Sequence, residues 1–259
     1  MRIIFDLHLV KKRFKNNFQK VIMQTNLDSK DYIYTNRMEA VEDLLSLLPH
    51  DVMQKEKWIL LALSRGSVEM AEKIADKLSL SFDIFIVKPL VAPNNSDCQI
   101  AMVSETKEIV MHDTLVKSFG ISVDYIYAEA QRRYNDDIMD NIYKFRKSLP
   151  LSDLKDKTVL LIDEGCETGL STLCALKSVL NLHTKKVSLA TPVIAEDLFY
   201  HLDLKVDKIY TNHRIENFIS VEYYYQELER IPGKVIRKKL DQSAYYLPYQ
   251  KEKDNELQS

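Results

Sequence analysis

Short apolar runs alternate along this chain with segments in which apolar residues recur every three or four positions. Four of the runs have the length and composition of buried strands, at residues 58–63, 82–87, 159–162 and 187–193. Helical spacing follows the first run between Val68 and Leu78, and the third between Leu173 and Leu180. Strands that alternate with helices predict an α/β fold with a mostly parallel core sheet.

Two further segments interrupt this alternation. Residues 88–112 carry prolines and asparagines and then two β-like runs, Gln99–Val103 and Glu108–Met111, which predict a long excursion or hairpin that leaves the sheet. Because long loops in compact domains are often active-site lids, we expect a lid around residues 89–112. Residues 124–147 are polar and helix-prone, with tyrosines interspersed.

The length of the chain limits the number of domains. It has 259 residues, of which 46% are hydrophobic, and this suits one large α/β domain or two small ones. We favour one domain over residues 31–240, preceded by a helical extension over 1–30 and followed by a polar tail over 241–259. The final residues, 250–259, are polar enough to fray.

The charge balance and cysteine usage exclude several classes of protein. Lysine and arginine number 36 against 38 acids, so the net charge of −2 gives no reason to expect a nucleic-acid partner, and any anion site must be local. The cysteines are odd in number and form no CxxC pair, which argues against disulfides or structural zinc and favours the cytoplasm; they are Cys98, Cys166 and Cys174. No apolar run reaches the ~18 residues of a membrane span, and the N-terminus lacks the order of a signal peptide.

Known phosphate loops and metal motifs are also missing. The sequence contains no GxxxxGK[ST] and no GxGxxG, so kinase, NTPase and dinucleotide-binding functions lack their usual loops. The six histidines show no metal-ligand spacing.

The segment that carries the most specific chemistry is VLLIDEGCETGLST, which begins at Val159. A buried strand is followed by the carboxylates Asp163 and Glu164, by a loop rich in glycine and hydroxyl groups, and by a helix. Such a loop offers backbone N–H groups to a phosphate at the crevice of an open α/β sheet. Hydroxyl groups in the loop could add hydrogen bonds, from Thr168, Ser171 and Thr172.

The two acids need a different partner, because carboxylates repel phosphate. A ribose diol suits them, and the pair could also hold Mg²⁺ through water. The alternative is that Asp163 and Glu164 form an ordinary polar turn at the end of a strand, and that the residues from Thr168 onward are a helix-capping signal.

This segment resembles the phosphoribosyl-pyrophosphate motif of type I phosphoribosyltransferases: an apolar run, two acids, three residues, Thr-Gly, one residue and Thr. Ser171 stands at the final threonine. The resemblance implies that Asp163 and Glu164 bind the ribose hydroxyls and, through water, Mg²⁺. It also implies that the loop binds the 5-phosphate, through Cys166, Thr168, Gly169, Leu170, Ser171 and Thr172.

A second match is LALSRGSVEMA, which resembles the pyrophosphate loop of the same family. It implies that Ser64 and Gly66 contact the ligand and that Arg65 acts on the leaving group. In the family this loop often holds a cis peptide, which here would join Ser64 to Arg65. The alternative is a surface turn between strand and helix, with a solvated arginine.

A wider likeness to a bacterial subgroup of phosphoribosyltransferase-domain proteins spans about residues 30–230. Within it, Arg37 and Lys88 match basic positions that could reach phosphate. The small C-terminal hood, which stacks the base in the family, would fall near Phe218–Tyr225. Plain packing is an equally good explanation for the tyrosines at 223–225.

Glu167 lies just before Thr-Gly, where family members that use 6-oxopurines carry an aspartate. The resemblance implies that Glu167 faces the purine ring as hydrogen-bond partner or general base. The alternative is a solvated glutamate near the start of a helix, where the helix dipole favours it.

Taken together, the resemblance implies a cytoplasmic, Mg²⁺-dependent glycosyltransferase of nucleotide salvage. It would transfer 5-phosphoribose from phosphoribosyl pyrophosphate to a nitrogenous base, with a purine as a candidate acceptor, and release pyrophosphate. Dimers are usual in the family, so we expect a homodimer. Two alternatives stay open: a regulatory module that senses phosphoribosyl pyrophosphate without catalysis, and an interaction protein whose site has decayed.

Overall fold

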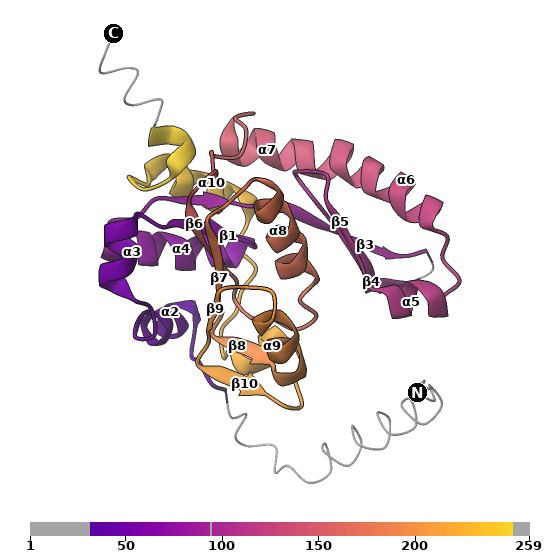
Figure 1. The fold of residues 1–259 in the computed structure, drawn as a ribbon, viewed down its shortest axis with the longest axis horizontal. Coiled ribbons are helices and arrows are strands. Elements are labelled where there is room, and N and C mark those ends of the chain that lie inside the picture. The colour runs from indigo at the N-terminus through magenta and orange to yellow at the C-terminus, as the bar shows by residue number, and fades with distance from the viewer. Residues whose placement is uncertain (1–31, 94, 251–259) are drawn as a thin grey trace.

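The centre of the molecule is a sheet of five parallel strands. The computed structural model describes residues 32–93 and 95–250. The strands lie in the order β2-β1-β6-β7-β9, and they are β1 (Ile59–Ala62), β2 (Phe82–Ile84), β6 (Thr158–Ile162), β7 (Lys186–Ala190) and β9 (Lys208–Tyr210) (Figure 1). The predicted α/β fold with a parallel core sheet is therefore confirmed.

Helices cover both faces of this sheet, which explains why its strands are continuous apolar runs. Alternate residues of β1 enter different cores: Leu60 joins the core on one face and Leu61 the core on the other. The first face is covered by α2 (Arg37–Leu45), α3 (His50–Glu56), α4 (Arg65–Leu78) and α10 (Gly233–Gln242). The second face is covered by α8 (Leu170–Asn181) and α9 (Glu196–Asp203).

Two of the predicted strands are shorter than their apolar runs. β2 ends at Ile84, and the chain then leaves the central sheet. β7 ends at Ala190, and after Thr191-Pro192 a separate strand, β8 (Val193–Ala195), begins. Proline lacks the N–H that a central strand must donate, so the run cannot continue in one sheet.

The segment expected to form a lid is instead an antiparallel sheet of three strands, called here the accessory sheet. It consists of β3 (Val87–Ala92), β4 (Asn95–Ser104) and β5 (Ile109–Met111). The excursion and the hairpin are as predicted, but this unit has a hydrophobic core of its own, which a mobile loop would lack. Helix α8 packs against all three strands and joins the unit to the central sheet.

The helix-prone segment forms the cover of the accessory sheet. It follows α5 (Asp113–Ser118) and consists of α6 (Val123–Arg133), a π-helical turn (Tyr134–Ile138) and α7 (Met139–Arg146), which run along that sheet in Figure 1. Ile126 and Ile138 are fully buried against it.

A buried ionic cluster fastens this unit to the central domain. The guanidinium of Arg146 is fully buried and donates a hydrogen bond to Glu105. Glu105 also accepts from the backbone N–H of Ile86 at 2.8 Å, and Asp83 accepts from the hydroxyl of Ser152 at 2.8 Å. Burial raises the pKa of Glu105 to about 7, although Arg146 opposes the shift.

The described part of the expected polar tail belongs to the folded core. Tyr246 and Tyr249 are buried, and both hydroxyls donate to the backbone carbonyl of Phe145. The backbone N–H of Phe82 donates to the carbonyl of Tyr245. These contacts join the described residues after 241 to the core. The expected extension over 1–30 and the residues 251–259 lie outside the described residues.

A small hood, defined as β8, β10 (His213–Ile215) and residues 216–229, stands beside the central sheet. The N-terminal segment contributes to it, because Tyr34 donates its backbone N–H to Tyr224 and accepts from Gln226. The predicted hood is therefore present, and it is built from both ends of the domain. Among the helices of the described residues, none is long and apolar enough to span a membrane.

Candidate active site

The two loops predicted to bind ligand lie side by side at one edge of the central sheet. Strands β1 and β6 are parallel neighbours, with Ala62 opposite Ile162. The pyrophosphate loop (residues 64–66) directly follows β1, and Asp163 directly follows β6. The carboxyl ends of parallel strands form the crevice at which open α/β sheets bind ligands.

The phosphate loop (residues 166–172) ends in the first turn of α8. Gly169 has a φ of 69°, and a Cβ there would lie 2.6 Å from Cδ1 of Leu198, so this position requires glycine. The N-cap residue is a glycine without a side chain, and the backbone N–H of Leu170 donates to Oγ1 of Thr168 at 3.5 Å. The other backbone N–H groups in the first turn of α8 remain available for an anion.

The side chains of the phosphate loop divide into two groups. Cys166 and Thr172 are buried and face each other, with Sγ and Oγ1 3.3 Å apart. Burial raises the pKa of the Cys166 thiol to about 12, so it stays protonated and unreactive. Thr168 is exposed and Ser171 is half-buried. The hydroxyl of Thr172 therefore faces Cys166 in the interior.

The two acids have different surroundings. Asp163 is half-buried, and its Oδ1 accepts a hydrogen bond from the backbone N–H of Glu164 at 2.9 Å. Burial, reinforced by the neighbouring Glu164, raises the pKa of Asp163 to about 7. Glu164 instead contacts protein donors at both oxygens: Nε of Arg37 at 2.5 Å and Oγ of Ser64 at 2.8 Å. No local pattern in the sequence indicated this pairing of Arg37 with a carboxylate.

The pyrophosphate loop is held by a reciprocal helix cap. Ser64 Oγ accepts from the backbone N–H of Ser67 at 3.0 Å, and Ser67 Oγ accepts from the backbone N–H of Ser64 at 2.7 Å. The peptide between Ser64 and Arg65 is trans, as are all peptide bonds of the described residues. The expected cis bond is therefore wrong, because extended backbone at Ser64 closes the cap without it.

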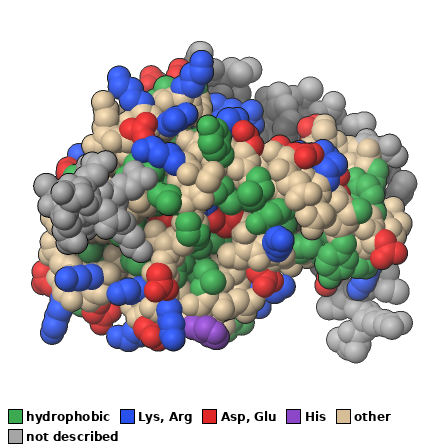
Figure 2. Space-filling view, turned by 90° about the horizontal axis from the view of Figure 1, so that it is seen from above, with side chains coloured by type: hydrophobic (Ala, Val, Ile, Leu, Met, Phe, Trp, Pro, Cys, Tyr) green, Lys and Arg blue, Asp and Glu red, His purple; other side chains and the backbone are tan. Residues whose placement is uncertain are grey.

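Unpaired cations gather beside this loop. Arg65 is exposed and Lys88 is half-buried, and within the described ranges neither forms an ion pair. Burial lowers the pKa of Lys88; Asp137 opposes the shift, whereas Arg65 adds to it. The side chains seen in Figure 2 mix both signs of charge without a dominant one. Arg65 and Lys88 are thus two cations close to the loop, with Asp137 also near Lys88.

The hood supplies aromatic rings, and its acid Glu222 lies near Glu167 of the phosphate loop. The Phe218 ring is half-buried, with its centroid 4.9 Å from that of Tyr224. Tyr224 and Tyr225 are buried and Tyr223 is exposed, so packing accounts for two of the three tyrosines. Glu167, in the phosphate loop, is exposed as a whole residue. Its carboxyl group is nevertheless partly shielded from water, and this shielding, followed by the charge of Glu222, raises its pKa.

Comparison with known proteins places this arrangement in a family. The sequence model of the family described as phosphoribosyl transferase domain matches residues 30–226. The chain belongs to this family. It is similar in fold to TT1426 from Thermus thermophilus, with a TM-score of 0.61 and 22% identity over 79% of this chain and 96% of that one.

A curated relative matches over a smaller part of the chain. Rv0571c of Mycobacterium tuberculosis, provisionally named a phosphoribosyl transferase, is 24% identical over 141 residues. The match covers 54% of this chain and 31% of that protein, so the chain spans about a third of the length of the curated relatives it matches.

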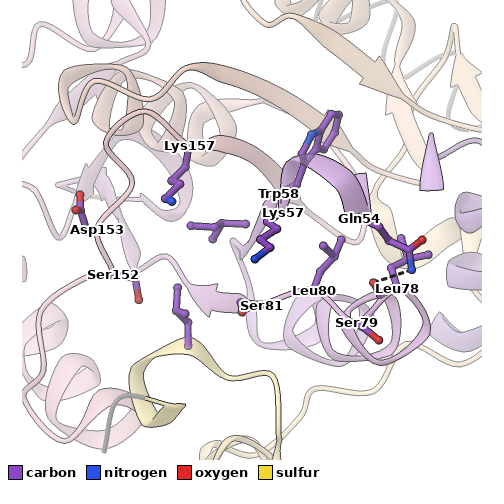
Figure 3. A pocket seen from close by; sticks show the side chains of 12 residues that line it. Gln54, Lys57, Trp58, Leu78, Ser79, Leu80, Ser81, Ser152, Asp153 and Lys157 are labelled. Atoms are coloured by element: carbon purple, nitrogen blue, oxygen red, sulfur yellow. Dashed lines mark hydrogen bonds between the residues drawn. The ribbon is translucent and has the colours of Figure 1, made fainter. Parts of the chain in front are cut away.

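The phosphoribosyl transferase domain also has a hollow of about 700 Å³ at the opposite edge of the sheet. Figure 3 shows Lys57 and Lys157 extending into it, close to Trp58, which precedes β1. Helices α3 and α4 end here, at Glu56 and Leu78, so the negative ends of two helices lie beside the two lysines.

Proposed function

We propose that the protein is a phosphoribosyltransferase that transfers 5-phosphoribose from phosphoribosyl pyrophosphate to a nitrogenous base and releases pyrophosphate. The observation that supports this most strongly is the pairing of two anion sites across the ends of β1 and β6. One is the start of α8, whose N-cap residue is a glycine, and the other is formed by Arg65 and Lys88. Asp163 follows β6 between them, where a sugar would join the two phosphate groups.

Each part of this donor has a partner of suitable chemistry. The backbone N–H groups at the start of α8, with the hydroxyls of Thr168 and Ser171, bind the 5-phosphate. Asp163 accepts hydrogen bonds from the ribose hydroxyls. Arg65 and Lys88 stabilise the negative charge that develops on the departing pyrophosphate.

The residues present also fit a magnesium ion that is shared with the substrate. Mg²⁺ is usually held by one or two carboxylates together with substrate phosphates, and Asp163 has no ion pair with a described cation. In the described part of the chain no three His, Cys, Asp or Glu side chains are grouped as a metal site. When bound, the ion would neutralise charge on the pyrophosphate.

The acceptor site lies between Glu167 and the hood, and we propose a purine as its occupant. The pKa of Glu167 is raised toward neutral pH. A raised pKa suits a general base that takes a proton from a ring nitrogen. Phe218 and the exposed Tyr223 offer aromatic faces to a planar base. The family resemblance adds a cytoplasmic homodimer to this proposal.

A pyrophosphate-release assay with Mg²⁺ against a panel of purines and pyrimidines tests the proposal. We expect release with at least one base, and calorimetry should detect binding of phosphoribosyl pyrophosphate. D163N should retain the fold and lose both signals. Binding without release for any base would identify a sensing module, and absence of binding would identify an interaction protein with a decayed site.

A further inference from the structure

Glu164 is connected to three segments that are distant in the sequence. Its carboxylate receives Arg37 from the start of α2 and Ser64 from the pyrophosphate loop. Its backbone carbonyl receives the hydroxyl of Tyr225 in the hood, at 2.6 Å. Nη2 of Arg37 donates to the backbone carbonyl of Glu229, also in the hood, at 2.6 Å. Glu164 therefore lies where the pyrophosphate loop, α2 and the hood meet.

The space around this carboxylate is shaped for it. A Cβ at Gly66 would lie 1.9 Å from Oε1 of Glu164, so the glycine of the pyrophosphate loop makes room for the side chain. The side chains of Arg37 and Glu164 are 12% and 15% exposed, so the pair is shielded from water. Shielding strengthens the attraction and also makes either partner costly to leave alone.

We propose that Glu164 is a positioning residue and does not bind the ribose. With Arg37, it fixes the pyrophosphate loop against the hood, and Asp163 alone contacts the ribose hydroxyls. This assignment rests on the proposed function. It differs from the role that the family motif implies for the second acid, because both oxygens of Glu164 are already bonded to protein donors.

The assignment predicts a specific pattern of charge effects. Removing Arg37 leaves Glu164 as an unneutralised carboxylate next to the loop that must receive an anion, so pyrophosphate binding should suffer. Removing the carboxylate as well abolishes this repulsion. The double variant should therefore bind pyrophosphate more tightly than the variant that lacks Arg37 alone.

The test is calorimetry with Mg²⁺ on R37M, E164Q, the double variant and D163N, with pyrophosphate and ribose 5-phosphate as separate ligands. We expect R37M to weaken pyrophosphate binding about tenfold, or ~1.4 kcal/mol, and the double variant to recover most of this loss. Ribose 5-phosphate affinity should stay within about twofold for these three proteins and fall at least about tenfold for D163N.

A general loss of stability would weaken both ligands together, so the split between them reports positioning specifically. If R37M does not fold, R37Q provides the same test together with R37Q/E164Q, because it removes the charge beside Glu164 and keeps a hydrogen-bond donor. Here too, pyrophosphate binding should weaken and ribose 5-phosphate binding should not.

Two results would overturn the assignment. A loss of ribose 5-phosphate affinity in E164Q as large as that in D163N would make Glu164 a ribose ligand. Equal weakening in R37M and the double variant would make Arg37 a direct phosphate ligand. A wild-type protein that binds neither phosphoribosyl pyrophosphate nor these fragments would instead reject the proposed function itself.

Discussion

Replacing Arg146 with methionine should destabilise the fold by an amount that depends on pH. Arg146 is fully buried, its partner Glu105 is 4% exposed, and the buried Asp83 also feels the positive charge. The substitution keeps the volume approximately and removes the cation. Breaking a buried ion pair in this way costs about 3–5 kcal/mol, a large part of the ~5–15 kcal/mol that stabilises a typical domain.

The pH dependence follows from Glu105. Its pKa is raised from an ordinary 4.5 to about 7, so the folded state holds a proton that the unfolded state releases. The stability that Glu105 contributes is fully present below its pKa in the unfolded state. It is lost as the pH rises through its pKa in the folded state. Without Arg146 the folded pKa rises further, because the burial that raises it is no longer opposed. The cost of R146M should therefore be large near pH ~8 and clearly smaller near pH ~5.

Urea unfolding followed by the fluorescence of Trp58, the single tryptophan, measures this effect. E105Q combined with R146M should remove the part of the pH dependence that Glu105 contributes and leave the part that the buried Asp83 contributes. R132M is the matched control, because Arg132 forms exposed ion pairs on α6 and should cost at most about 1 kcal/mol. Equal costs of R146M at both pH values would refute the reasoning, as would a cost no larger than that of R132M.

Three further substitutions test the site. R65A should slow turnover about 10²-fold while ribose 5-phosphate affinity is kept, because Arg65 acts on the leaving group; equal losses in kinetics and calorimetry would contradict this. E167Q should preserve donor binding and lower turnover by about 10²- to 10⁴-fold if Glu167 is the base, whereas a change of a few-fold would make it a surface acid. G169A should destabilise the fold by about 1–3 kcal/mol and weaken phosphate binding, since φ is positive and Leu198 blocks a Cβ; unchanged thermal unfolding would show that the turn adapts.

The sequence determined the parts of this protein that depend on neighbours along the chain. Apolar runs and helical spacing identified the parallel strands and the helices that follow β1 and β6. The spacing of apolar residues along a segment directly reflects which of its faces is buried. The loop before α8 and the loop before α4 were visible for the same reason. Each is a short sequence in which glycine, hydroxyl and charged groups must occur in one order to close a turn.

Only the tertiary structure decided how these parts are used. Glu164 meets Arg37 across 127 residues, and Thr172 turns inward to Cys166, because helix orientation and sheet order set which side of a residue faces the crevice. Likewise, Tyr246 and Tyr249 follow a polar segment yet are buried. Local periodicity records that a face is apolar, but not what will cover it. Which segment covers the face depends on packing between parts of the chain that are far apart in sequence. A local pattern carries no information about that packing energy.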